Sequence, residues 1–134
     1  MQKYIDTISF LMLDFQLIEE ALKTCIDETN KKIRIVVRGK IPFKYSRQDV
    51  GKDALGTLIN KFEKINNNMR LITKLKELPP KRNNIAHKGL LFTLAEQNDK
   101  KDIALKIKKL EILRKETRAI LFELLEEFKK IKQN

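Results

Sequence analysis

The residues best suited to chemistry are the chain's one histidine, His87, and Arg82, which lies five positions before it. An imidazole titrates near neutral pH, so a single histidine can act as a base or as an acid. A guanidinium presents a fork of donors that fits phosphate oxygens and stabilises charge developing on phosphorus. This pair therefore suits proton transfer beside a phosphate. If the nucleophile is the 2′-hydroxyl of RNA, the reaction needs no metal and leaves a 2′,3′-cyclic phosphate and a 5′-hydroxyl.

The local spacing suggests a role for each residue of this group. Arg82 stands near the expected start of a helix, just after a Pro-Pro pair, where free N–H groups and the helix dipole attract anions. Asn83 and His87 are four residues apart and therefore share a helical face. We predict a catalytic set in which Arg82 binds phosphate, Asn83 positions the substrate and His87 transfers the proton. Lys81 and Lys88 flank the set as candidate RNA contacts.

The run Arg82-Asn83-Asn84-Ile85-Ala86-His87 resembles the Arg-x(4–6)-His signature of the HEPN superfamily, in the form where Asn follows the Arg. The stretch Ala54–Ile59 also looks like a mid-domain helix common in that family. The resemblance implies an α-helical bundle and a metal-independent endoribonuclease of a toxin–antitoxin, abortive-infection or antiviral defence system. It also implies a homodimer with a composite Arg/His site. One subgroup carries a Tyr at the position of Gly89, so regulation by nucleotide transfer to that position is not expected here.

Other interpretations of the same residues remain open at this point. His87 could lie on a helix surface or form a hydrogen bond inside a bundle. Arg82 could pair with an acid at a helix end, while Asn83 and Asn84 could serve as caps. The chain could then be a non-catalytic HEPN-like module that binds RNA or a partner protein, such as a nucleotidyltransferase antitoxin. It could also be a structural helical protein that self-associates through its long helices.

The charge of the chain indicates an anionic partner, with RNA the first expectation. Lys and Arg number 29 against 18 Asp and Glu, which gives a net charge of +11. A stretch without acidic residues carries Lys31, Lys32, Arg34, Arg38, Lys40, Lys44 and Arg47. Its side chains could bind RNA phosphates, with Phe43 and Tyr45 stacking on bases. Alternatively, the stretch is a solvated loop that these two aromatic residues anchor to the core.

The hydrophobic pattern predicts a single all-α domain over residues 1–134, built as a four- to five-helix bundle. Apolar residues recur at helical spacing over about 3–30, 52–66, 69–78, 81–95 and 100–132, and the positions expected in the core include Ile5, Met69, Leu90, Leu91 and Leu94. The Asn-rich turn at 66–68 is expected to cap the helix that follows it, and Asn98 and Asp99 are expected to cap the last helix. The first and last of these helices are long and carry wide apolar stripes, part of which could form a dimer surface. Residues 31–51 break the pattern as a basic insertion. This insertion could be a short hairpin, a helix extension or an ordered loop.

The remaining features argue against cofactors and membrane insertion. Cys25 is the chain's one cysteine and lies on an apolar stripe, so we expect a buried, inert thiol. One Cys and one His cannot supply a zinc site, and we expect neither a metal nor a cofactor. No apolar run approaches the ~20 residues that span a bilayer. The flanking acids around the apolar run 10–13 do not suit a signal peptide, so we expect a cytoplasmic protein that does not associate with membranes.

Overall fold

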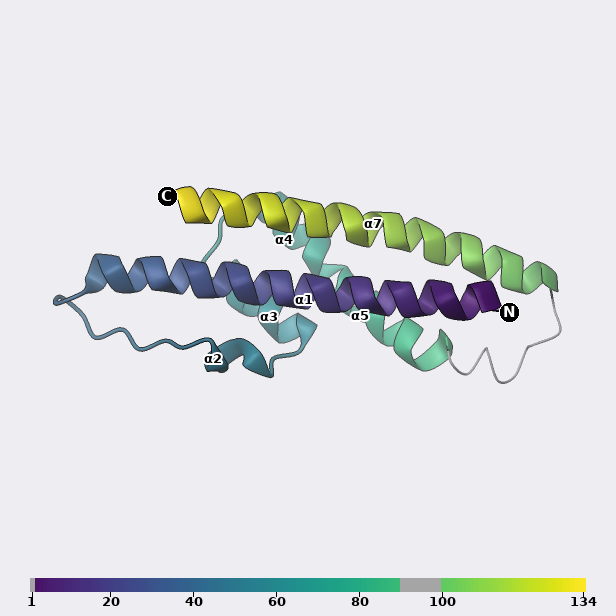
Figure 1. The fold of residues 1–134 in the computed structure, drawn as a ribbon, viewed down its shortest axis with the longest axis horizontal. Helices are drawn as coiled ribbons and strands as arrows, with labels where there is room; N and C mark the ends of the chain where they lie inside the picture. The colour runs from purple at the N-terminus through teal and green to yellow at the C-terminus, as the bar shows by residue number, and fades with distance from the viewer. Residues whose placement is uncertain (1, 90–99) are drawn as a thin grey trace.

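The computed structural model describes residues 2–89 and 100–134, and most of them are helical (Figure 1). No strand occurs within these residues, which confirms the predicted all-α bundle. Its elements are α1 (Gln2–Val37), α2 (Gln48–Gly51), α3 (Leu55–Glu63), α4 (Met69–Lys76), α5 (Leu78–Asn84), the π-helical turn η1 (Ile85–Gly89) and α7 (Lys100–Gln133).

The two long helices, α1 and α7, lie side by side and run in the same direction (Figure 1). Three contacts show how the two helices are aligned. Arg114 faces Asp14, the Cys25 thiol donates to the Leu124 carbonyl, and Lys32 donates to the Lys132 carbonyl. Each partner on α7 is thus about one hundred positions beyond its partner on α1. Parallel neighbours need a long return connection, and α2 to α5 supply it on one side of the α1–α7 pair.

The core contains the apolar stripes that the sequence predicted. On α1, the side chains of Leu11, Phe15, Ile18 and Leu22 are completely buried. Helices α3, α4 and α5 add further buried residues, among them Leu58, Ile59, Phe62, Leu71, Ile72, Leu75 and Leu78. Two expected core positions were wrong, since Ile5 is 38 % exposed and Met69 is 55 % exposed. Met69 is the first residue of α4, at the outer edge of the bundle.

The insertion at 31–51 resolves into a helix extension, a loop and a short helix. Helix α1 continues through Val37, seven residues beyond its expected end, although this part is rich in β-branched residues. Ile33 and Val37 are half-buried, and Lys32 in the same segment donates to the Lys132 carbonyl of α7; tertiary contacts of this kind override weak helix propensity. The chain then turns at Gly39, whose φ of 76° is the left-handed conformation that glycine adopts without strain. The hairpin alternative was therefore wrong.

The expected helix over 52–66 is shorter in the structure, where α3 covers Leu55–Glu63 and the separate short helix α2 precedes it. Asn68 caps α4 by accepting a hydrogen bond from the Leu71 N–H at 3.2 Å, as the Asn-rich turn predicted. Helix α5 begins at Leu78, earlier than expected, because the first turn of a helix tolerates prolines that lack an N–H. The expected core residues Leu90, Leu91 and Leu94 and the expected caps Asn98 and Asp99 lie outside the described residues.

A buried carboxylate joins α1 to α7 near the middle of the pair. The Asp14 side chain is only 7 % exposed, and its Oδ2 lies 3.4 Å from Arg114 Nε and 3.8 Å from Arg118 Nε. Arg114 also lies over the Phe10 ring, 4.8 Å from its centroid. A carboxylate removed from water needs such partners, because an uncompensated buried charge is costly.

Removing both arginines should therefore leave Asp14 buried and unpaired. We expect Arg114→Ala/Arg118→Ala to lower the free energy of unfolding by about 3 kcal/mol, measured by urea denaturation. The matched control Lys108→Ala/Lys115→Ala removes two exposed charges from the same helix and should cost less than about 1 kcal/mol. Equal losses in the two variants would show that the Asp14 pairs do not stabilise the fold.

Cys25 also lies where α1 packs against α7 and is fully buried, as expected. Burial, with a smaller contribution from the Glu127 carboxylate, raises the pKa of its thiol from 9.0 to about 12. The thiolate is the reactive form, so at pH 9 the folded protein should react with a disulfide reagent roughly several hundred times more slowly than the unfolded protein. Stopped-flow labelling with and without guanidinium chloride measures this ratio. Comparable rates in the two states would contradict the buried placement.

Candidate functional site

The candidate residues lie on α5 and η1, on one side of the α1–α7 pair, and this segment contacts both long helices. Leu78 and Ile85 are buried and anchor this segment to the core. Lys81 Nζ reaches Glu116 Oε2 of α7 at 3.4 Å, and Arg82 Nε reaches Glu19 Oε1 of α1 at 3.8 Å. The two adjacent basic residues thus point to opposite long helices.

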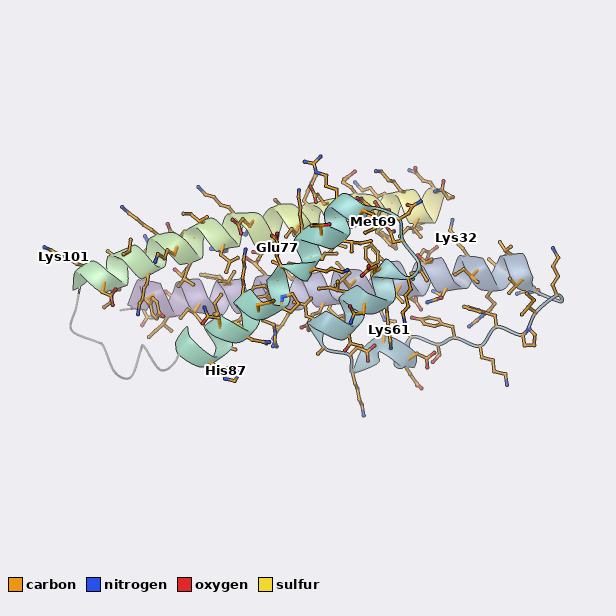
Figure 2. The ribbon with its side chains drawn as sticks, turned by 180° about the vertical axis from the view of Figure 1, so that it is seen from behind. Lys32, Lys61, Met69, Glu77, His87 and Lys101 are labelled. Carbon is orange, nitrogen blue, oxygen red and sulfur yellow. The ribbon has the colours of Figure 1, made fainter. Side chains whose placement is uncertain are left out.

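The other candidates lie on the outer face of the segment. Asn83, Asn84 and His87 are all exposed. Figure 2 shows His87 at the edge of the bundle, toward the opposite end of the molecule from Lys32. Leu78 and Ile85 define the inward direction, and the helical spacing puts Asn83 and His87 together on the outward side. The predicted shared face of Asn83 and His87 therefore agrees with the geometry.

His87 lies in the π-helical turn η1. A π turn closes i→i+5 hydrogen bonds, so it is wider than an α-helical turn, and such turns frequently occur at functional sites. The change from α5 to η1 falls between Asn84 and Ile85, inside the Arg82–His87 run. The run therefore does not form one uniform helix.

Arg82 and His87 are not brought into contact in this single chain. The Arg82 side chain is 36 % exposed and faces Glu19, whereas His87 faces outward. Within residues 2–89 and 100–134, no side-chain hydrogen bond or ion pair joins Arg82, Asn83 and His87 to one another. The site thus consists of an exposed Asn83–His87 surface with the Arg82 guanidinium on its flank.

Glu19 and Glu116 are the neighbours of this segment that sequence reasoning missed. Both lie on the long helices, far from Arg82 in the sequence, and no motif or local spacing connects them to it. The general possibility that Arg82 pairs with an acid was open, but its partner depends on how α5 packs against α1. Only the tertiary structure could identify Glu19.

The basic segment 31–47 combines structural and free charges. The Arg34 guanidinium donates to the Tyr45 carbonyl, and Arg47 lies 3.5 Å from Glu20. Arg38, Lys40 and Lys44 are exposed and have no ion pair within the described part of the chain. The side chain of the remaining predicted RNA contact, Lys88, lies outside the described residues.

The two aromatic residues of this segment are half-buried. Tyr45 packs against the hydrophobic core, and burial raises the pKa of its hydroxyl above the ordinary value. This placement favours an anchoring role for the Tyr45 ring over stacking on a base. Phe43 is partly exposed.

Two properties of the described residues bear on the class of site. They contain no cluster of three His, Cys, Asp or Glu side chains that could hold a metal ion. None of their helices is both long and apolar enough to cross a bilayer.

Comparison with other proteins leaves the family of this chain open. No protein-family model matches the chain, and neither the curated proteins nor the solved structures include a match. The fold and the geometry above are therefore the observations on which a function can be argued.

Proposed function

We propose that the chain is a metal-independent endoribonuclease of the HEPN type, acting in a defence or toxin–antitoxin system. The observation that carries this proposal is the Arg82–His87 run at the junction of α5 and η1, with Asn83 and His87 exposed on one outward face. The all-α bundle with two long helices and the net charge of +11 support it. An exposed imidazole can reach a polymer that is too large to enter a closed pocket.

The proposed reaction is an internal transfer at phosphorus. The His87 imidazole takes the proton of the 2′-hydroxyl, and the 2′-oxygen forms a bond to phosphorus while the bond to the 5′-oxygen breaks. The leaving 5′-oxygen receives a proton from the imidazolium of a second copy's histidine. The products are a 2′,3′-cyclic phosphate and a 5′-hydroxyl, so atoms and charge balance without a cofactor. DNA lacks the nucleophile and should not be cleaved.

Arg82 has to exchange its partner for this reaction. Its pair with Glu19 is 3.8 Å long and partly exposed, and pairs of that kind contribute about 0–1 kcal/mol. A phosphate that accepts two parallel hydrogen bonds from the guanidinium binds it more strongly. Arg82 would therefore turn from Glu19 to the substrate and stabilise the charge on phosphorus.

A homodimer is part of the proposal because the single chain supplies one imidazole. The long helices support self-association, since they expose the apolar side chains Ile5, Phe10, Leu13, Leu17, Leu105, Ile112, Phe122 and Leu125. Leu17 and Glu19 are two residues apart on α1, so they lie on opposite faces of that helix. Glu19 faces Arg82, so a dimer that packs through Leu17 would keep the candidate sites of the two copies apart. A composite site therefore requires that the two copies contact each other along η1.

A second candidate function is a non-catalytic module of the same fold that binds RNA or a partner protein such as an antitoxin. The observation that favours it is the orientation of Arg82, which faces Glu19 and makes no contact with His87. In that case the basic residues would bind without cleavage.

The catalytic proposal predicts cleavage of RNA in the presence of EDTA. We expect His87→Ala and Arg82→Ala to reduce the cleavage rate by at least ~100-fold, because general acid–base catalysis and charge stabilisation each contribute about that much. Arg70→Ala is the matched control, since Arg70 is an exposed arginine without an ion pair in the described part of the chain. Gel analysis of end-labelled RNA, with identification of the cyclic phosphate, measures the outcome.

If all four proteins cleave alike, the activity does not come from this site and the catalytic proposal fails. If none cleaves but the wild type binds RNA in a salt-dependent manner, the non-catalytic module replaces it.

The composite site can be tested by proximity of the two copies. His87→Cys introduces an exposed thiol, whereas Cys25 is buried and has a pKa raised to about 12, so only residue 87 should react. We expect a short bismaleimide to link two His87→Cys chains efficiently. Asn60→Cys, at an exposed position on α3, is the control and should not form this link. Absence of a link at residue 87 in a chain that is dimeric by light scattering would exclude the composite arrangement.

A further inference from the structure

We propose that the C-terminal ends of α1 and α7 and the loop after α1 form a second site for RNA. This exosite, defined as residues 31–47 and 129–134 and called the basic end, would hold the phosphate backbone of single-stranded RNA at a distance from His87. The inference rests on the proposed function in one respect, since it assigns a further contact to the same substrate. The binding itself does not depend on cleavage.

The charge of the protein is concentrated at this end. Residues 31–47 and 129–134 contain ten basic side chains and no acidic one. The other 111 residues carry 19 basic and 18 acidic side chains, so they are almost neutral. The net charge of +11 is thus a local property of the basic end and not a general feature of a lysine-rich surface.

The two segments of the basic end are joined in space. Both long helices finish at the same end of the bundle (Figure 1), and Lys32 Nζ donates to the Lys132 carbonyl at 2.9 Å. Three of the ten basic residues have acidic partners: Lys31 with Asp27, Arg47 with Glu20, and Lys129 with Glu126. The others make no ion pair within the described part of the chain, and they are Lys32, Arg34, Arg38, Lys40, Lys44, Lys130 and Lys132.

Helix dipoles explain only a small part of this charge. Two parallel helices bring two negative dipole ends together, and each end is equivalent to about half an elementary charge. The basic residues in the last turns, Arg34, Lys130 and Lys132, more than compensate for the resulting charge of about −1. Seven cations without acidic partners against a dipole charge of about −1 leave a net charge of about +6, and a polyanion is the partner that neutralises such a group.

The position of the basic end relative to His87 favours RNA as this polyanion. Arg82 contacts α1 at Glu19, and α1 ends at Val37, so about 27 Å of helix separates the two sites at a rise of 1.5 Å per residue. The loop after α1 and the end of α5 lie on the same side of α1 in both views (Figures 1 and 2). At the rise of about 3.4 Å per nucleotide of a stacked helical strand, about eight nucleotides span that distance, and an extended single strand spans it with fewer.

An anionic membrane is the other polyanion to consider, because Ile35, Val36 and Ile41 are each about two-thirds exposed at this end. A lipid surface would need the cations gathered around these aliphatic side chains. Arg34, Arg38 and Lys40 do flank them in the sequence, but the cations also continue away from these side chains, through Lys44 to Arg47, beside α2 and toward α5. This distribution fits an extended strand better than a flat surface, so we assign the basic end to RNA.

The test measures binding of a fluorescent 25-nucleotide uridine homopolymer in the His87→Ala background, by anisotropy over a range of KCl concentrations. The plot of log affinity against log salt has a negative slope, and each lost phosphate contact reduces the magnitude of that slope by about 0.7 for single strands. Lys130→Gln/Lys132→Gln should therefore reduce the slope by about 1.4 and the affinity at 0.1 M salt by roughly tenfold or more. Lys108→Gln/Lys115→Gln removes the same charge from a distant part of α7 and should change neither value.

Two further arms separate the alternatives. Ile35→Ser/Val36→Ser should leave RNA affinity unchanged, and the protein should not bind phosphatidylserine–phosphatidylcholine vesicles through these side chains. Equal RNA affinity of the two double-lysine variants would overturn the exosite. So would vesicle binding that depends on Ile35 and Val36 if Lys130→Gln/Lys132→Gln left RNA binding unchanged.

In the His87-containing chain, the Lys130/Lys132 variant should cleave a 5-nucleotide RNA normally and the 25-nucleotide RNA more slowly. If the His87-containing chain does not cleave either RNA but its RNA affinity still depends on Lys130 and Lys132, the proposed function is contradicted and the exosite is not.

Discussion

The parallel packing of α1 against α7 is the constraint on which the rest of the structure depends. The two helices supply about half of the buried apolar residues, and the Cys25–Leu124 contact and the ion pairs of Asp14 fix how they are aligned. Parallel helices cannot be joined by a short turn, so the chain has to travel back along the whole pair. The return connection begins at Gly39, where a positive φ reverses the chain. Every element between α1 and α7 therefore follows from this one arrangement.

The return connection is fastened to the long helices by polar contacts as well as by apolar packing. Asn66 and Asn68 both donate to the Glu127 carboxylate at 3.0 Å, while the Asn68 side-chain oxygen caps α4. One asparagine thus ends a loop, starts a helix and satisfies a buried acid on α7. Further along, Lys81 and Arg82 extend from α5 to α7 and α1 respectively. These contacts place η1 at the edge of the bundle and leave His87 exposed.

Sequence periodicity predicted the apolar stripe of α1 and the cap at Asn68, because both depend on neighbours within one or two helical turns. It failed where long-range contacts decide. Propensity argued against a helix at Ile33–Val37, yet that segment, which the Lys32–Lys132 contact joins to the end of α7, is helical. The same limit applies to the candidate site, since Arg82 could be assigned to an acid in general but not to Glu19 in particular.

The separation between charge and chemistry has a physical consequence for the proposed function. At the α5–η1 site, Glu19 and Glu116 offset the charges of Arg82 and Lys81, so this region attracts a polyanion only weakly. The basic end carries nearly all of the net charge and would dominate the field that steers RNA toward the protein. Capture at one end and reaction at the other would then be distinct steps. An RNA molecule held at the basic end could bring one of its phosphates to Arg82, where that phosphate would compete with Glu19 for the guanidinium. The effective concentration of the phosphate would be set by the length of RNA between the two sites.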